Sequence, residues 1–210
     1  MPIFRTIKEH LFIAKMADNS LESEIFSFYI QQDHIFLAER AKAFAILAAR
    51  APFVELQEYL TTRAQQSKEA SEGIFEKYAM GSPSASTMSP ACKAYTEYMV
   101  NVAQNGSFLE GLAAQLPCSV MYQKLGEYIH SNFSEPNKFI GWINTYSNPE
   151  RRKNVETFIG FIDKVAALDI YENISAAKKA FHTASKYEFE FWDDALNLRT
   201  AQGVACDELR

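Results

Sequence analysis

Apolar residues recur at spacings of three and four along most of the chain, which is the period of an amphipathic helix. The N-terminal stretch 2–17 follows this period, with Phe4 and Leu11 on one side. The polar residues 18–20 supply turn and helix-start chemistry after it. The next stretch, from about 21 to about 51, keeps the helical period over a much greater length. We therefore predict two consecutive helices, the second much longer than the first.

Proline, glycine and polar turns divide the rest of the chain. Pro52 predicts the start of a third helix, ending near 79, because proline is accepted in a first helical turn. The polar stretch 80–90 predicts a loop. Five further helices are expected at about 91–103, at about 107–130, from about 136, from about 149, and at about 172–200. The prediction is one all-α domain over 1–210 with about eight helices, too many and too uneven for a simple four-helix bundle.

Charge and cysteine usage narrow the class of partner. The formal net charge is −5 and basic residues gather only at 151–153, whereas nucleic-acid binders carry a basic patch. No apolar run approaches the ~20 residues of a membrane helix. The three cysteines are widely spaced and form no disulfide framework, which favours a reducing compartment. We expect a cytoplasmic protein that acts on a small molecule and binds neither nucleic acid nor membrane.

The stretch "AAQLPCSVMYQKLG" places a proline directly before a cysteine inside a helical pattern. Pro117 removes one helical hydrogen bond, so we expect a bend and something close to a new helix start at Cys118. Free N–H groups at such a start would lower the pKa of the thiol and raise its thiolate fraction. Tyr122 lies one turn further along the same face. This pattern is typical of an activated nucleophile, and also of a bent core helix that holds a small buried cysteine.

Two acidic residues lie among aromatic neighbours. Asp33, in "YIQQDHIF", is on the face used by aromatic residues, and an unpaired buried carboxylate is costly. It could bind the N–H groups of an amidine-like ligand, or form an ion pair with a nearby Lys or Arg. Glu188, in "KYEFEFWDDA", is flanked by rings, and desolvation there should raise its pKa as a proton donor requires. Glu190 should be solvated. Tyr95 and Tyr146 could each be ordinary core tyrosines.

Metal ligands are sparse. Helical bundles that hold two iron ions use pairs of Glu-x-x-His motifs. Only Glu127 and His130 have that spacing, and one copy is insufficient. We therefore predict that the chain has no metal site.

Four segments together resemble one family. "LPCSVMYQKLG", "YIQQDHIF", "GWINTY" and "YEFEFWDDA" occur in an order and spacing similar to those of the thiaminase II family, also called TenA or aminopyrimidine aminohydrolase. The resemblance runs along nearly the whole chain. It implies a haem-oxygenase-like all-α fold without haem, a homotetramer, and no metal or organic cofactor. It also implies hydrolysis of 4-amino-5-aminomethyl-2-methylpyrimidine to the hydroxymethylpyrimidine used in thiamine salvage, and cleavage of thiamine.

The resemblance also implies roles for particular residues. Cys118 would be the nucleophile, and Glu188 the acid–base group on the ring nitrogen. Tyr122 and Tyr146 would orient or assist the cysteine. Asp33 would hold the amidine edge of the pyrimidine. The residues expected to sandwich that ring are Tyr95, Phe36 and Phe191.

The chain departs from the family pattern at three positions. Many relatives have a tyrosine where Phe36 stands, which removes one hydroxyl from the expected pocket. Bulkier aromatic residues are common where Ser119 and Val120 follow the cysteine. The presence of Cys118 assigns the chain to the cysteine-containing branch of the family.

Two other classes of function stay open at this stage. One is a pyrimidine-binding or regulatory protein with little turnover, and the other is a helical oxidase or oxygenase acting on another small molecule. The sequence does not discriminate between the aminopyrimidine, its formyl derivative and thiamine as substrate, because all three share the ring that Asp33 and Glu188 would hold. Cys92 and Cys206 lie in no motif and are expected to be unreactive.

Overall fold

Helices make up almost all of the chain that the computed structural model describes, namely residues 2–78, 88–201 and 203–204. Within these ranges there are nine helices and one short strand pair. The helices are α1 (Pro2–Lys8), α2 (Leu11–Ala17), α3 (Ser23–Ala49), α4 (Val54–Tyr78), α5 (Pro90–Asn105), α6 (Phe108–Asn132), α7 (Ile140–Ser147), α8 (Pro149–Ala166) and α9 (Tyr171–Leu196). The antiparallel strands are β1 (Arg199–Thr200) and β2 (Gly203–Val204).

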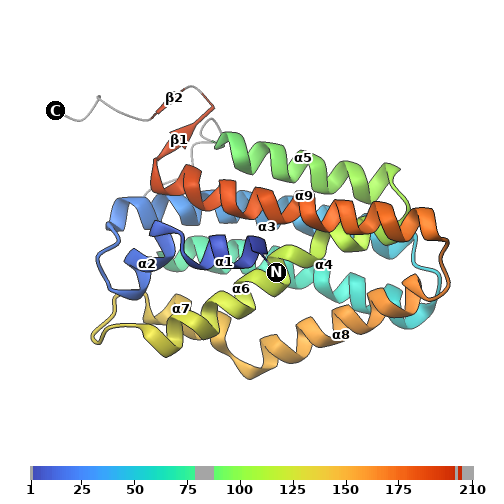
Figure 1. Cartoon of the computed structure of the whole chain (residues 1–210), viewed down its shortest axis with the longest axis horizontal. Helices are drawn as coiled ribbons and strands as arrows, with labels where there is room; N and C mark the ends of the chain where they lie inside the picture. Colours follow the sequence, from blue (N-terminus) through green and yellow to red (C-terminus); the bar gives the residue numbers. More distant parts are fainter. Residues whose placement is uncertain (1, 79–87, 202, 205–210) are drawn as a thin grey trace.

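Three long helices, α3, α6 and α9, carry the interior of the bundle. The helix α3 packs along α4 and α5, while α9 packs against α5 and α6 (Figure 1). The helix α6 also contacts α7 and α8. Asp33, Cys118 and Glu188 lie on α3, α6 and α9 respectively, so the fold brings segments distant in sequence to one interior.

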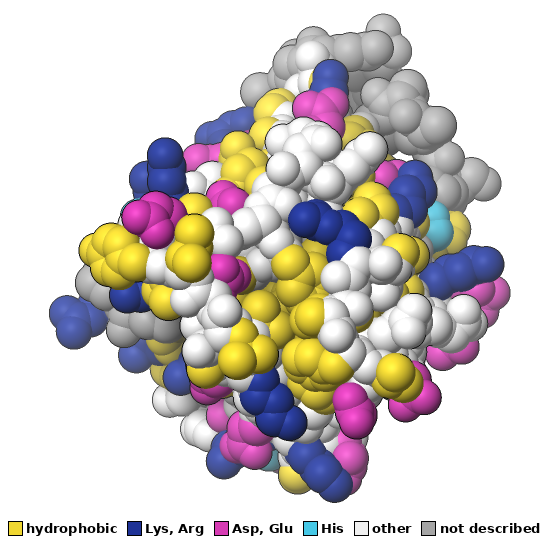
Figure 2. All heavy atoms as spheres, turned by 90° about the vertical axis from the view of Figure 1, so that its right-hand side faces the viewer, with side chains coloured by type: hydrophobic (Ala, Val, Ile, Leu, Met, Phe, Trp, Pro, Cys, Tyr) yellow, Lys and Arg dark blue, Asp and Glu magenta, His cyan; other side chains and the backbone are white. Residues whose placement is uncertain are grey.

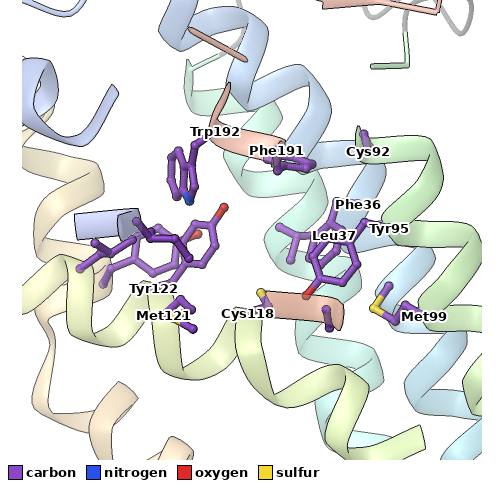
Figure 3. Close-up of a cluster of buried hydrophobic side chains, with 14 of the residues drawn as sticks. Phe36, Leu37, Cys92, Tyr95, Met99, Cys118, Met121, Tyr122, Phe191 and Trp192 are labelled. Carbon is purple, nitrogen blue, oxygen red and sulfur yellow. The ribbon is translucent and has the colours of Figure 1, made fainter. Parts of the chain in front are cut away.

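Aromatic side chains fill much of that interior (Figure 3). Tyr29 stacks on Trp192, with ring centroids 4.8 Å apart and an interplanar angle of 16°. Trp142 of α7 packs edge-on against the same Trp192, with ring centroids 6.2 Å apart. Such ring pairs add roughly 0.5–1.5 kcal/mol each beyond the area they bury. They hold α3, α7 and α9 together around the polar residues described below.

Capping residues explain why α6 begins where it does. The hydroxyl of Ser107 accepts a hydrogen bond from the Glu110 backbone N–H (3.2 Å), and the Glu110 carboxylate accepts one from the Ser107 N–H (2.9 Å). This reciprocal capping box satisfies donors that a helix start leaves unpaired. Helix α5 begins similarly at Ser89, and α8 at Asn148.

The prediction of one helix over 2–17 is wrong. His10 is in an extended conformation and its Nδ1 accepts the Phe12 N–H at 3.2 Å, so it caps α2 and separates it from α1. The apolar period continues across His10, so the sequence pattern gives no sign of the break between the two helices. Nine described helices therefore replace the expected eight.

Two other predicted helix ends are displaced. Helix α7 begins at Ile140 rather than near 136, because the Asn137 side chain donates to the Met16 carbonyl at 2.9 Å and accepts the Phe139 N–H. These bonds hold the preceding segment against the end of α2. Helix α9 ends at Leu196, and Leu198 has a positive φ of 50°, which a helix does not accommodate.

Most of the predicted polar loop 80–90 lies outside the described residues, as does Cys206. No described helix is both long and apolar enough to cross a membrane. Figure 2 shows the end of the bundle where α8 joins α9, and hydrophobic side chains gather on this face among charged ones. Leu168, Ile170 and Tyr171 in this connection are exposed.

We predict that Gly126→Ala destabilises the protein by roughly 1–3 kcal/mol, the usual effect of overpacking. A Cβ at Gly126 would overlap the backbone of Tyr146 and lie 2.6 Å from its Cβ, so α6 and α7 would have to separate. Gly160→Ala is the matched control, since its Cβ would meet no atom within 4 Å. It should instead stabilise by about 0.4–1 kcal/mol. Urea unfolding of both variants tests this, and equal stability of the two would contradict it.

Candidate active site

Helix α6 carries the cysteine in its interior. The helix runs without interruption from Phe108 to Asn132, with Pro117 inside it. The expected new helix start at Cys118 is therefore wrong, because a missing N–H at one residue does not end a helix that is packed on both sides. The positive end of a helix dipole is not available to the sulfur.

The expected low pKa of the thiol is also wrong. Cys118 is 4% exposed, and burial raises the pKa of its thiol to about 12. The positive charge of Arg40 acts in the opposite direction but is the smaller influence, and the negative charge of Glu188 adds to the rise. At neutral pH the resting group is a thiol and not a thiolate.

Glu188 lies on α9 beside the thiol, bound to a tyrosine. Its carboxylate accepts a hydrogen bond of 2.8 Å from the Tyr95 hydroxyl of α5. Glu188 is 2% exposed, and burial raises its pKa to about 8, although the Tyr95 bond acts to lower it. Figure 3 shows that the Tyr95 hydroxyl points toward Cys118. The Tyr95 hydroxyl thus contacts the acid and points toward the sulfur.

Asp33 is the second buried acid and lies on α3. Burial raises its pKa to about 7, while the positive charges of Arg151 and Arg40 lower it. Its one hydrogen bond is a long one of 3.5 Å from the Tyr29 hydroxyl. No Lys or Arg nitrogen in the described chain lies within 4.0 Å of this carboxylate. The ion-pair interpretation of Asp33 is therefore not supported, and the carboxylate retains capacity to accept hydrogen bonds.

A row of tyrosines connects the two sides of the site. The hydroxyls of Tyr29 and Tyr122 lie 3.3 Å apart, and the Tyr122 ring packs on Tyr146 at 5.0 Å. Because the single Tyr29 proton is donated to Asp33, Tyr122 is the donor between the two tyrosines. All three tyrosines are buried. Burial raises the pKa of each of them, and the negative charge of Asp33 adds to the rise, so their hydroxyls stay protonated as donors.

Phe36 contacts both of the other rings that are expected to sandwich a pyrimidine. Phe36 and Tyr95 have centroids 4.8 Å apart, and Phe36 and Phe191 are 5.8 Å apart. Two rings that enclose a third need about 7 Å between them, since stacked carbon atoms approach to about 3.5 Å. In this structure the three rings form one wall of the site.

Arg40 is a site residue that the sequence analysis missed. It lies on α3, two turns after Asp33, and is 1% exposed. Its Nη2 donates to the Gln115 carbonyl at 2.9 Å and to the Ser119 hydroxyl at 2.8 Å. A basic residue on the apolar face of a long predicted helix was the available signal, because such a charge is rarely buried without a task.

Metal ligands do not cluster in the described part of the chain, where no group of three or more His, Cys, Asp or Glu could hold an ion. Glu127, which forms the single Glu-x-x-His pair with His130, contacts the guanidinium of Arg152. The arrangement consists of a buried thiol, two buried acids and hydroxyl donors, which is suited to proton transfer and covalent chemistry on a flat polar ring.

The amino-acid sequence is similar to that of one protein family over nearly its whole length. The model of the TENA/THI-4/PQQC family matches residues 1–198. The chain is 29% identical to the aminopyrimidine aminohydrolase of Halalkalibacterium halodurans, over 94% of this chain and 92% of that protein. It is 30% identical to the aminopyrimidine aminohydrolase of Bacillus subtilis, over 87% of this chain and 80% of that protein.

Solved structures confirm the predicted fold. A TenA homologue from Pyrococcus furiosus superposes with a TM-score of 0.85 at 25% identity, covering 92% of this chain and 94% of that one. A domain with a heme oxygenase-like fold from Shewanella denitrificans has a TM-score of 0.70 at 12% identity, covering 92% and 87%. The fold is therefore haem-oxygenase-like and all-α.

The two buried acids make a testable contribution to pH-dependent stability. Each holds its proton in the folded state up to a pH near 7–8 but loses it near 4 when unfolded. The free energy of unfolding should therefore fall as pH rises through that window, by about 1.4 kcal/mol per pH unit for each group. Glu188→Gln should remove one such slope, as measured by urea unfolding between about pH 5 and pH 6.5.

Glu190→Gln is the matched control, because Glu190 lies two residues away on the exposed surface of α9. It should keep the wild-type slope. Identical slopes for wild type and Glu188→Gln would show that Glu188 is not held protonated by burial.

Proposed function

The chain belongs to the TENA/THI-4/PQQC family, and from this premise we propose that it is a cysteine-dependent aminopyrimidine aminohydrolase. Two relatives of similar length carry that name. The proposed substrates are 4-amino-5-aminomethyl-2-methylpyrimidine and thiamine, and the product is the hydroxymethylpyrimidine of thiamine salvage. We further propose that the protein acts in the cytoplasm without a metal or organic cofactor.

One observation carries this proposal: the neutral acid Glu188 is hydrogen-bonded to Tyr95 beside the Cys118 thiol. An aminopyrimidine is a poor electrophile until a proton or a strong hydrogen bond reaches its ring nitrogen. A carboxyl group with a pKa of about 8 is protonated at neutral pH and can supply that proton. The group proposed to activate the ring and the group proposed to attack it therefore both lie next to Tyr95 in the buried interior.

In the first step the sulfur adds to the ring carbon and forms a C–S bond. Glu188 gives its proton to the ring nitrogen, Tyr95 replaces that proton on Glu188, and the thiol proton passes to Tyr95. One proton thus moves from sulfur to ring nitrogen, and no thiolate has to exist beforehand. This route is compatible with a thiol whose resting pKa is about 12.

In the second step the electron pair of the ring nitrogen expels the amine from the exocyclic methylene. The amine, bound as its ammonium form, leaves as ammonia with the electrons of the C–N bond. Water then adds to the methylene carbon and loses a proton. Return of the ring proton to sulfur breaks the C–S bond and releases the alcohol. Covalent catalysis of this kind replaces one difficult displacement by easier steps.

Asp33 holds the ring during both steps. Its carboxylate accepts the N–H groups of the amidine edge, and the ligand would supply the hydrogen bonds that the aspartate lacks here. Phe36, Tyr95 and Phe191 provide an apolar wall for the flat ring. Tyr122 and Tyr146 orient the cysteine from the opposite side.

The high pKa of the thiol favours a second candidate, a pyrimidine-binding protein with little turnover. Calorimetry that finds tight binding of the aminopyrimidine, together with no release of ammonia, would identify this case. For assembly we propose a homotetramer, with the exposed apolar residues of the α8–α9 connection as one candidate contact. Light scattering that finds one chain per particle would contradict that assembly.

Replacement of the thiol is the direct test of the nucleophile. Cys118→Ala should lower kcat for ammonia release from the aminomethylpyrimidine by at least about 10³-fold, because the covalent route is lost. Cys92→Ala is the matched control, since Cys92 is also buried and its thiol donates to the Gln32 carbonyl rather than facing the proposed site. It should keep most of the activity. Full activity of Cys118→Ala would remove Cys118 from the nucleophile role.

Replacement of one hydroxyl tests the proton route. Tyr95→Phe keeps the ring but not the hydrogen bond to Glu188, so we expect kcat to fall by about 10²-fold with little change in KM. Because that bond lowers the pKa of Glu188, its loss should also move the alkaline limb of the rate profile to higher pH. Tyr187→Phe, whose ring stacks on Tyr95 at 5.5 Å, is the control. An unchanged rate and profile in Tyr95→Phe would exclude the relay.

A further inference from the structure

Three arginines from three helices gather next to the proposed nucleophile. Arg40 of α3 donates to the hydroxyl of Ser119, the residue that follows the cysteine. Arg63 of α4 and Arg151 of α8 line a pocket of about 120 Å³ together with the same Ser119. The positive charges of Arg40 and Arg151 both lower the pKa of Arg63, which burial and these neighbours bring to about 10. The three cations therefore share one small region.

Each of these guanidinium groups keeps a buried donor without an acceptor. No carboxylate in the described chain lies within 4.0 Å of any of the three. The Nε atoms of Arg40, Arg63 and Arg151 are each buried without a hydrogen-bond partner. Arg40 as a whole is 1% exposed. A buried donor without an acceptor is costly, and clustered like charges add to that cost.

Part of this arrangement serves the acids already described. Burial raises the pKa of Asp33, and the charges of Arg151 and Arg40 offset part of that rise. Arg63 is not among the groups that shift the pKa of Asp33 or of Glu188. Its guanidinium lines the pocket and donates only to the Gln66 side chain.

The pocket has the size and charge of a site for a small anion. A volume of 120 Å³ corresponds to roughly four water molecules, which is enough for one phosphate or carboxylate group. Glu150 is the one acidic residue on its wall, against the two guanidinium groups that line it and the third behind Ser119. Asn148 and Asn154 add amide groups. Guanidinium forks match the oxygens of phosphates and carboxylates.

We propose that this pocket is an oxyanion subsite, and that the preferred substrate carries a phosphate or carboxylate group that reaches past Ser119. The identity of that substrate rests on the proposed function, because the ring itself would lie at Cys118, Asp33 and Glu188. The subsite does not determine which ring binds next to Cys118. It selects aminopyrimidines by the charge of the attached group.

The first experiment measures anion binding without turnover. Binding is measured by calorimetry, and the unfolding temperature is measured in parallel. Inorganic phosphate and succinate are the ligands, and sodium chloride at equal ionic strength is the control. Phosphate or succinate should bind and stabilise the wild type. Arg63→Gln and Arg151→Gln should each weaken that binding about tenfold or more, since each removes charged hydrogen bonds. Two variants are used so that a folding defect in one does not decide the result.

Arg152→Gln is the matched control, because it removes the same charge from the same turn of α8 at an exposed position away from the pocket. It should bind the anions as the wild type does. Equal binding by Arg63→Gln, Arg151→Gln and wild type, or no binding by any, would overturn the subsite. The stronger of the two anions identifies the group that the pocket prefers.

The second experiment compares kcat/KM for thiamine monophosphate and thiamine. The ratio should exceed one in the wild type and fall about tenfold in Arg63→Gln if the pocket prefers phosphate. Hydrolysis of thiamine with no anion binding would overturn the subsite and leave the proposed function intact. Anion binding that depends on Arg63 without hydrolysis of any aminopyrimidine would support the subsite and overturn the proposed function.

Discussion

Removal of ionisable groups from water is the constraint on which the site depends. The helical core places a thiol and two carboxyl groups among packed aromatic rings, and burial is the largest influence on the pKa of all three. Each group is thereby shifted toward its neutral form. The capping box of α6, the close approach of Gly126 to Tyr146 and the ring stack around Trp192 maintain that dry interior. The chemistry is consequently inseparable from the packing.

A buried site of neutral groups favours steps in which proton transfer accompanies bond formation, because no isolated ion is then formed. With Glu188 protonated and Cys118 a thiol, the addition step can move one proton from sulfur to ring without creating an isolated ion. Burial is countered by Arg40 at both acids, whereas Arg151 counters it at Asp33 and the Tyr95 hydrogen bond counters it at Glu188. The two acids therefore have different neighbours and can have different tasks.

Helical periodicity and capping chemistry were sufficient to predict the class of fold and most helix ends. Ser107, Ser89 and Asn148 each begin a helix as their side chains suggest. The break at His10 could not be seen, because the apolar period continues across it and the capping bond depends on local geometry. The start of α7 depends on Asn137 binding a carbonyl 121 residues away, which no local pattern contains.

The sequence predicted which residues come together in the interior better than it predicted their pKa values and hydrogen bonds. Asp33, Cys118 and Glu188 come from three separate helices into one interior, as the motifs suggested. The thiol pKa went the opposite way from the prediction, because a proline is a local signal whereas desolvation is set by the whole fold. Tyr95 was expected to provide only a ring and instead donates a hydrogen bond to Glu188. Arg40 was missed because its charge is explained only by partners on α6.

The central claim is that Glu188 is a neutral carboxylic acid at the pH at which the protein works. Difference infrared spectroscopy of wild type against Glu188→Gln at neutral pH tests it directly. The account predicts a protonated carboxyl C=O band in the wild type that is absent from the variant and that disappears as pH rises past about 8. A spectrum with only the ionised carboxylate bands at neutral pH would contradict it.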